Sequence, residues 1–369
     1  MAFLARYDKF PENDYDKNLW EGGMRSNRVC RGWFGVSAVF ALGLAAQDAR
    51  GETIAEFYKD KTLSLLIGFT PGDGYDVPAR LMARHLVEHI PGKPGLVPRN
   101  MTGAGGRNVM THVYNIAPRD GTVIATIEQS LPLQQALGET FQFDCTQFTW
   151  IGNQIAGTNV LSTWHASGVK TIEDAKRREV TIGATGSGSS QQPKLMNQLL
   201  GTKFKIVLGY QGGSQINLAM ERGEVDGRTN TLASYKSVNP DWLRDNKINI
   251  LTQIALTKSP ELPDVPLLLD LATNDDDRTL LKLISTSATI GRSIVSTPAV
   301  PAERAQALRR AFDATMKDPR FLEDAARAKI DFNPMTGETL ERIVADIMAT
   351  PKPLAERLAE LIGGIGEGR

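Results

Sequence analysis

Two glycine-rich segments, each between a short apolar run and a helical pattern, constrain the fold of this chain most strongly. Residues 68–76 follow the apolar run 62–67, and residues 183–190 follow the run 180–182. A strand, a glycine turn and a helix start in this order leave several backbone N–H groups free to bind an anion. Because ligands of α/β proteins bind at this strand-to-helix position, the pair predicts a cleft that holds a small anionic ligand from two sides. The alternative is that both segments are ordinary connecting turns.

Strand and helix patterns alternate along the chain, which predicts an α/β fold with parallel or mixed sheets covered on both faces. At a length of 369 residues, two such sheets are expected rather than one. The expected strands are residues 63–69, 122–127, 148–153, 160–164, 180–184, 205–208 and 248–255, with an extended piece at 96–97. The expected helices are residues 77–89, 107–116, 172–177, 192–200, 214–222, 301–317, 320–328, 337–349 and 352–362. Asp76 is expected to cap the first helix, and the acidic segment 274–278 is interpreted as a solvated loop.

The N-terminal region has the pattern of a secretory signal. Arg25, Arg28 and Arg31 precede the apolar residues 33–46, and the small residues Ala49 and Gly51 follow at the two positions that a signal peptidase reads. The apolar stretch is too short to span a membrane, which takes about 20 residues. We therefore expect residues 24–51 to be a cleaved signal peptide, with residues 1–23 a non-structural extension and the mature chain in the periplasm. The alternative is an internal hydrophobic helix of a cytosolic protein.

Charge and cysteine content narrow the class of partner. The chain has 42 basic and 42 acidic side chains, which argues against nucleic acid or an anionic membrane surface as its partner. Cys145 is the single cysteine beyond the expected signal peptide, so no internal disulfide is expected and stability must come from core burial.

One motif suggests metal chemistry. His85, Glu88 and His89 form the H-x-x-E-H pattern of inverzincin metalloproteases, with two imidazoles on one helical face and a glutamate to activate water. The motif lies at the far end of its helix from the glycine segment, so a solvated helix end is expected instead of a zinc site. The chain has no Gly-x-Ser-x-Gly nucleophile motif and no Lys-Ser/Thr after a glycine loop. The sequence therefore predicts a protein that is not an enzyme and holds no metal or cofactor.

Several short motifs, in the same order along the chain, resemble those of one family. Residues 68–76 (GFTPGDGYD) resemble the signature Gly-Phe-Pro-Pro-Gly-Gly-x-x-Asp, and residues 100–106 (NMTGAGG) resemble Asn-x-x-Gly-Ala-Gly-Gly. Further matching segments are residues 118–122, 186–190, 210–213, 223–226, 262–266 and 297–301. Over nearly all of residues 57–350 the chain thus resembles the substrate-binding proteins of tripartite tricarboxylate transporters, of the Bug or TctC type.

The resemblance implies a two-lobed periplasmic binding protein (Venus flytrap), with a Rossmann-like sheet in each lobe and two interlobe crossovers. Lobe 1 would comprise residues 52–152 plus 288–369, and lobe 2 residues 153–287. A monomer would bind a small carboxylate in the interlobe cleft, either a di- or tricarboxylate, an acidic amino acid or an aromatic acid. It would deliver this ligand to the membrane components of the transporter. Backbone N–H groups and helix dipoles can hold such an anion without a fixed cation.

The resemblance and the glycine segments together give the expected ligand-binding residues. They are Phe69, Thr70, Pro71, Gly72, Asp73, Gly74, Tyr75, Asp76, Gly105, Gly186, Ser187, Gly188, Ser189, Ser190, Tyr210, Asp226 and Asn230. Bulk at Gly72 or Gly188 is expected to abolish binding, because the main chain must approach the ligand at these positions.

The sequence departs from the family pattern in two places. Asp73 stands where the family has a glycine, and Gln191 and Gln192 stand where relatives often carry a histidine. A carboxylate beside an anion site repels the ligand unless it faces solvent, carries a proton or meets an ammonium group. We expect a solvated Asp73, and a ligand that carries an amine is the alternative.

Two other functions remain open from the sequence. The chain could be an exported α/β enzyme that acts on a carboxylated substrate, or a sensor that passes ligand occupancy to a membrane kinase. Recovery of unchanged ligand after incubation would separate a receptor from an enzyme.

Overall fold

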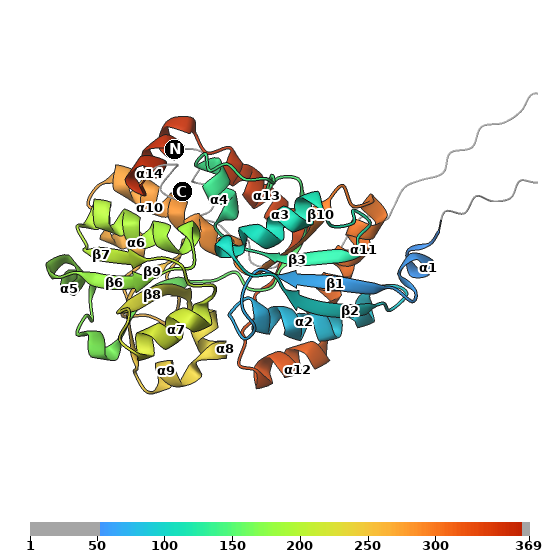
Figure 1. The fold of residues 1–369 in the computed structure, drawn as a ribbon, viewed down its shortest axis with the longest axis horizontal. Coiled ribbons are helices and arrows are strands. Elements are labelled where there is room, and N and C mark those ends of the chain that lie inside the picture. The colour runs from blue at the N-terminus through green and yellow to red at the C-terminus, as the bar shows by residue number, and fades with distance from the viewer. Residues whose placement is uncertain (1–51, 364–369) are drawn as a thin grey trace, which may run out of the picture. The chain divides into compact units, whose positions relative to one another are not determined.

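The strands of the chain divide between two mixed sheets. The computed structural model describes residues 52–363, and within them the sheets have six and five strands (Figure 1). The six-stranded sheet has, in order, β11 (Met335–Thr336), β4 (Phe148–Asn153), β10 (Ser293–Pro298), β3 (Val123–Ile127), β1 (Thr62–Ile67) and β2 (Gly95–Asn100). The five-stranded sheet has, in order, β7 (Phe204–Val207), β6 (Val180–Gly183), β8 (Gly227–Thr231), β5 (Asn159–Trp164) and β9 (Ile248–Ile254).

Each sheet combines parallel and antiparallel pairs. β1 pairs in parallel with β2 and β3, and β6 does so with β7 and β8. The antiparallel strands are β10, between β3 and β4, β11, at the edge beside β4, and β5, between β8 and β9. The carboxyl ends of the parallel strands lead into loops and helix starts, which is where ligand sites of α/β sheets form.

Helices cover both faces of each sheet. The helices are α1 (Ile54–Tyr58), α2 (Asp76–His89), α3 (Arg107–Asn115), α4 (Leu131–Ala136), α5 (Ile172–Arg177), α6 (Ser187–Leu200), α7 (Gly213–Glu221), α8 (Leu232–Val238), α9 (Pro240–Arg244), α10 (Asp275–Ile290), α11 (Ala302–Thr315), α12 (Pro319–Arg327), α13 (Gly337–Met348) and α14 (Lys352–Leu361). In the six-stranded half, α2 and α12 lie on one face of the sheet, and α3 and α13 on the other (Figure 1). In the five-stranded half, α6 and α7 lie on opposite faces.

Apolar side chains hold each half together. In the six-stranded half, Leu65 of β1, Met82 of α2 and Phe312 of α11 belong to one buried cluster. In the five-stranded half, Ile216 of α7 and Trp242 of α9 belong to another. Full burial of a side chain of this kind contributes about 1.5–3 kcal/mol, so each half has its own source of stability.

Two stretches of chain cross between the halves and lie side by side. One joins β4 to β5 and the other joins α10 to β10. Gln154 N donates to Arg292 O (3.0 Å), and Arg292 N donates to Ile155 O (2.9 Å). Gly291 has φ +51°, and a Cβ there would stand 1.9 Å from Ile155 O, so only glycine allows this approach.

The C-terminal helix complicates the predicted division into lobes. α14, within the predicted lobe 1, packs against α6 of the five-stranded half. The lobe boundaries 52–152 plus 288–369 and 153–287 remain a prediction.

Three local expectations are wrong. The acidic segment 274–278 is not a loop, because Asp275, Asp276 and Asp277 form the first turn of α10, where negative charge complements the helix dipole. Asp76 is the first residue of α2 rather than its N-cap. The strands β8 and β10 were not expected, because short runs rich in Ser, Thr and Arg show no clear apolar period.

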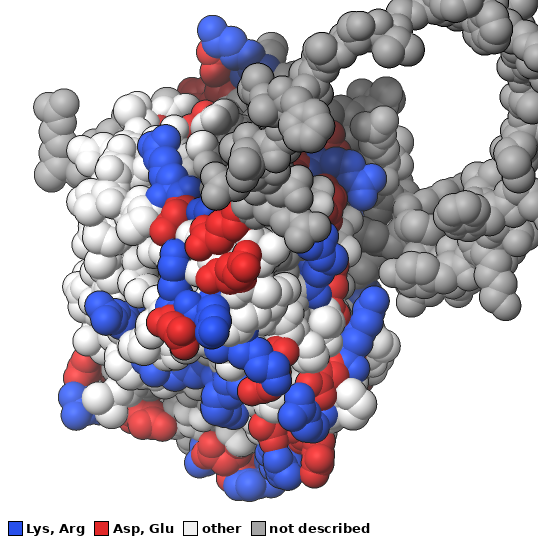
Figure 2. Space-filling model, turned by 90° about the vertical axis from the view of Figure 1, so that its right-hand side faces the viewer, with Lys and Arg blue, Asp and Glu red and all other residues white. Residues whose placement is uncertain are grey.

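The surface shows no gathering of one sign of charge on the face drawn in Figure 2, where basic and acidic side chains are interspersed. Among residues 52–363, no helix has the length and apolar character needed to cross a bilayer. The predicted signal peptide and extension, residues 1–51, lie outside the described residues.

Candidate ligand-binding site

A polar pocket lies where loops of the two halves meet. The six-stranded half contributes the loop after β1 and the loop after β3, and the five-stranded half contributes the ends of β6 and β8. The pocket is lined by Phe69, Asp73, Tyr75, Glu128, Gln129, Ser130, Asn159, Thr185, Gly188, Ser189, Gln192, Gly213, Arg228, Thr229, Asn230, Thr231, Ser287 and Arg292. Its empty space, open mouth included, is about 560 Å³.

The loop after β1 is held by its own carboxylate, Asp76. Asp76 is buried, and its Oδ2 accepts a hydrogen bond from Gly72 N (2.8 Å). Its Oδ1 accepts from Arg80 Nε and from Asn100 Nδ2, both at 2.8 Å. One of the N–H groups expected to bind the ligand is therefore already satisfied inside the protein.

Two aromatic rings and an arginine stack beside the pocket. The rings of Phe69 and Tyr75 are nearly parallel, with centroids 4.4 Å apart, and the Arg292 guanidinium lies 3.8 Å from the Tyr75 centroid. Tyr75 Oη accepts from Gln129 N (3.1 Å), and burial raises the pKa of Tyr75. The cation–π contact and the hydrogen bond fix the ring against the pocket wall.

Asp73 connects the two halves. It is buried, its Oδ1 accepts from Tyr75 N (3.0 Å), and its Oδ2 accepts from Gly213 N (2.6 Å). Gly213 begins α7, so the carboxylate faces the positive end of a helix dipole. The expectation of a solvated Asp73 is wrong, because backbone N–H groups, including one from the other half, stabilise its charge.

Arg228 of β8 supports the same helix start. Its Nη1 donates to Gly213 O (2.6 Å) and to Asn217 Oδ1 (2.8 Å), both in α7. A Cβ at Gly213 would stand 2.6 Å from this guanidinium and 2.8 Å from Asp73 Oδ2, so a larger residue does not fit. Burial lowers the pKa of Arg228.

Arg292 is a buried cation with bonding capacity left over. Only 6 % of it is exposed; its Nε donates to Gly74 O (3.0 Å) and its Nη2 to Thr231 Oγ1 (3.1 Å). Its Nη1 is buried without a hydrogen-bond partner, and no carboxylate of the described residues lies within ion-pair distance. Because an isolated buried charge is costly, this position favours an anion in the pocket.

Other pocket atoms are also unsatisfied. Gln129 Nε2 donates to Asn159 Oδ1 (3.2 Å), which leaves Gln129 Oε1 and Asn159 Nδ2 buried without partners. Thr229 Oγ1 is in the same situation. Buried polar atoms are nearly always hydrogen-bonded, so this cluster is suited to a polar guest.

The second glycine segment brings the two halves close together. A Cβ at Gly188 would stand 2.1 Å from Ser130 Oγ, 2.9 Å from Gln134 Nε2 and 3.0 Å from Glu128 Oε2. A Cβ at Gly186 would stand 3.3 Å from the Cα of Gly105. The glycines at these positions therefore permit contact with the six-stranded half.

The comparisons with known proteins agree with this architecture. The family described as the tripartite tricarboxylate transporter family receptor (TctC) matches residues 79–359. The chain belongs to this family. It is also 25 % identical over 337 residues to a UPF0065 protein in the gbd 5′ region of Cupriavidus necator, covering 87 % of this chain and 94 % of that protein.

Solved structures of periplasmic binding proteins share the fold of this receptor. The BugD structure aligns with a TM-score of 0.66 at 18 % identity, covering 83 % of this chain and 99 % of that one. The R. palustris Rpa4515 structure with adipate aligns with a TM-score of 0.64 at 19 % identity, covering 82 % of this chain and 97 % of that one. The structure of MatC (Rpa3494) from Rhodopseudomonas palustris with bound malate aligns with a TM-score of 0.65 at 17 % identity, covering 80 % of this chain and 99 % of that one. The predicted family and the two-lobed α/β fold are thereby confirmed.

The structure brings together some of the predicted site residues and not others. Those that line the pocket are Phe69, Asp73, Tyr75, Gly188, Ser189 and Asn230. Gly105 and Gly186 line a smaller adjoining space. The side chain of Ser187 lies outside the described part of the structure. The remaining predicted residues, Thr70, Pro71, Gly72, Gly74, Asp76, Ser190, Tyr210 and Asp226, are not among the lining residues of either.

The surroundings of Gly72 and Asp226 explain why these two residues do not line the pocket. Gly72 is exposed, and no atom lies within 4 Å of a Cβ built on it, so the expectation that bulk there would meet the ligand does not hold. Asp226 Oδ2 accepts from Thr181 N and Oγ1, both at 2.8 Å, which holds β6 to the turn before β8.

Sequence reasoning missed the charged residues of the pocket, Glu128, Arg228 and Arg292. The sequence does contain a signal for Glu128, because this residue directly follows an expected strand, as the glycine segments do. Arg228 lies in β8 and Arg292 directly precedes β10, two strands that the sequence does not predict, and no local pattern marks either arginine. The expectation that the site works without a fixed cation is therefore wrong for the pocket lining.

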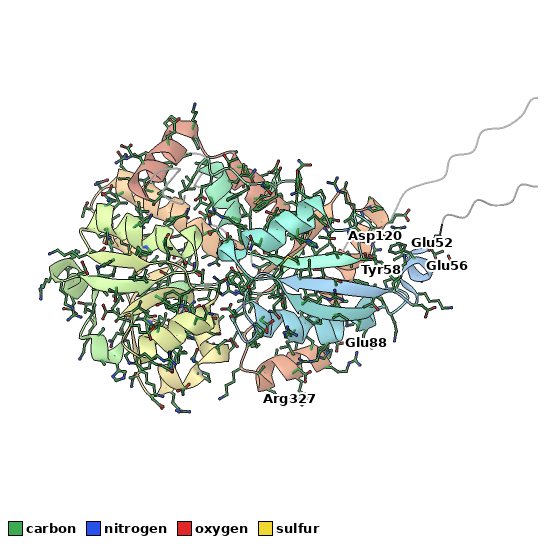
Figure 3. The ribbon with its side chains drawn as sticks, in the orientation of Figure 1. Glu52, Glu56, Tyr58, Glu88, Asp120 and Arg327 are labelled. Carbon is green, nitrogen blue, oxygen red and sulfur yellow. The ribbon has the colours of Figure 1, made fainter. Side chains whose placement is uncertain are left out.

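The H-x-x-E-H motif has a different environment from the one that a zinc site needs. His85 Nε2 lies 2.9 Å from Asp324 Oδ2, and His89 Nε2 lies 3.0 Å from Asp318 Oδ2. Glu88, labelled with Arg327 on the same flank in Figure 3, instead pairs with Lys93 at the surface (3.1 Å). No group of three potential metal ligands occurs among residues 52–363. The histidines thus attach α2 to α12 and its N-cap, and the helix end is less solvated than expected.

Proposed function

We propose that this receptor binds a small organic carboxylate in the pocket between its halves and delivers it to the membrane components of a tripartite tricarboxylate transporter. The observation that carries the proposal is Arg292, a buried guanidinium in the pocket wall with one nitrogen unsatisfied and no ion-pair partner among residues 52–363. A ligand carboxylate would supply the missing acceptor and place a negative charge in direct contact with the guanidinium.

Two further observations support this proposal. Asn159 Nδ2 and Thr229 Oγ1 lie unsatisfied in the same pocket and can donate to the same anion. The related structures named above contain adipate and malate, which are dicarboxylates. Because Arg292 lies in one crossover and contacts Gly74 and Thr231, ligand at its Nη1 would add contacts at the junction of both halves.

Calorimetric titration of the purified receptor with mono-, di- and tricarboxylates, amino acids and aromatic acids tests the proposal. At least one acid should bind, and Arg292→Met should weaken it at least about thirtyfold, since truncating one partner of a buried charge pair costs 2 kcal/mol or more. Arg342→Met, on the exposed surface of α13, is the matched control and should bind like wild type. Unchanged affinity in the Arg292 variant would place the ligand elsewhere.

The same preparation tests the enzyme alternative. The bound acid should be recovered chemically unchanged after long incubation, and conversion to a product would contradict a receptor role. Intact-mass measurement of periplasmic material addresses export: we propose a mature chain that begins near Glu52 and carries no acyl group.

A further inference from the structure

The charged groups of the pocket are balanced, and this limits the ligand. Asp73 and Glu128 are acidic, and Arg228 and Arg292 are basic. Each oxygen of Asp73 already accepts a hydrogen bond from a backbone N–H group, and Arg228 is bound to α7, whereas Arg292 Nη1 has no partner. Arg292 and Glu128 are therefore the charged pair with capacity left for a ligand.

Glu128 presents an acceptor that the protein does not use. Its Oε2 accepts from Ser130 N (2.9 Å) and Ser130 Oγ (2.5 Å), whereas no described residue donates to its Oε1. The basic side chain of Arg107 lies near but pairs with Glu139. Next along the chain, Gln129 Oε1 is a second unsatisfied acceptor. The pocket thus offers acceptors as well as the donors around Arg292.

A plain carboxylate leaves these acceptors unsatisfied and adds net negative charge beside Glu128. A dicarboxylate adds two such charges to a site that is neutral without it, at a cost that rises with burial. A ligand that carries one cationic amino group in addition to its carboxylate restores the balance and donates to the free acceptors.

Resting on the carboxylate-receptor function proposed above, we infer that the ligand is a small carboxylic acid with a protonated amino group. Its carboxylate binds Arg292 Nη1 with Asn159 Nδ2, and its ammonium binds Glu128 Oε1 with Gln129 Oε1. Glu128 is then the residue that distinguishes amino acids from plain organic acids.

Matched acids that differ only by an amino group test this inference in calorimetric titrations. The pairs are succinate with aspartate, glutarate with glutamate, and butyrate with 2-aminobutyrate. In the pair that fits the pocket, the amino member should bind at least tenfold more tightly, equivalent to about 1.4 kcal/mol. Glu128→Gln should remove most of that preference, and Glu128→Asp, which keeps the charge, should retain part of it.

Glu88→Gln, on the exposed end of α2, is the matched control and should leave the preference unchanged. Thermal unfolding of each variant shows whether it is folded. Burial raises the pKa of Glu128, so a neutral Glu128 that donates to a plain acid is the rival arrangement. In that arrangement Glu128→Gln binds succinate or glutarate as wild type does, and this result would overturn the inference.

The outcomes also separate this inference from the proposed function. Tight binding of the plain acids, with no preference for their amino partners, would support the carboxylate-receptor function and contradict the inferred amino group of the ligand. Failure of every acid of either kind to bind the folded wild type contradicts both.

Discussion

The loop between β1 and α2 and the loop between β6 and α6 have similar sequences, but they contribute to the site in different ways. In the first loop the contacts come from side chains: Asp76 binds Gly72 N, Asp73 reaches α7, and Tyr75 stacks under Arg292. The second loop leads into the first turn of α6, where the glycine itself matters, because any Cβ at Gly188 would collide with the six-stranded half. A glycine-rich turn at a strand end can thus serve ligand binding through close packing of two halves as well as through free N–H groups.

The largest effect on ligand affinity is expected from a larger side chain at Gly188, in the first turn of α6. Gly188→Val should weaken ligand binding at least tenfold, because the new side chain displaces Ser130 and Glu128 and keeps the halves apart. Calorimetric titration measures the loss. In the first loop, Gly72→Asn is the contrasting change, since asparagine tolerates the φ of +78° and meets open space. Equal weakening by Gly72→Asn and Gly188→Val would contradict the claim that the two glycine segments contribute to binding in different ways.

The next effect concerns the contact between Asp73 and α7. Asp73→Gly removes a charge-assisted hydrogen bond across the halves, which contributes roughly 1.5–3 kcal/mol. Affinity should therefore fall by about tenfold or more for every ligand that contacts both halves of the pocket. If Asp73 acted instead by repelling an anionic ligand, the same variant would bind plain acids more tightly. Titration with one plain acid and one amino acid distinguishes these results.

A smaller effect, on stability rather than affinity, is expected at Asp76. Asp76→Asn loses the charge that accepts from Gly72 N, Arg80 Nε and Asn100 Nδ2, and should lower the free energy of unfolding by about 1–3 kcal/mol. Urea unfolding followed by circular dichroism gives the change. Titration of the folded variant should show affinity near that of wild type, since Asp76 does not line the pocket.

The smallest effect is a local response to acid at the far end of α2. Hydrogen bonds from Arg320 and His89 lower the pKa of Asp318, and those from His85 and Arg327 lower the pKa of Asp324. Both carboxylates ionise more readily in the folded chain, so they stabilise it above the ordinary aspartate pKa of about 3.9. This contribution is lost as the pH falls below that value. Hydrogen exchange should therefore accelerate in α2 and α12 below pH 4 before it does in α6. Equal acceleration in α6 would contradict this.

The sequence by itself determined the class of fold, the family and the position of most regular elements. Strands such as β4 and helices such as α5 fall within a residue of their expected limits, because apolar periodicity and capping residues act over a few neighbours. The strand-to-helix position of both glycine segments followed from the same local order. The sequence also places Glu128 directly after an expected strand, the position in which ligand-binding residues of α/β proteins occur.

The tertiary structure decided which side chains meet in the pocket. Arg292 reaches Gly74, 218 positions away, and Asp73 reaches Gly213, 140 positions away. Such contacts depend on how two separately packed sheets approach each other, and no short pattern encodes that approach. The buried charges illustrate the reason: the cost of an unpaired guanidinium or carboxylate depends on what surrounds it in space, which the local sequence does not specify.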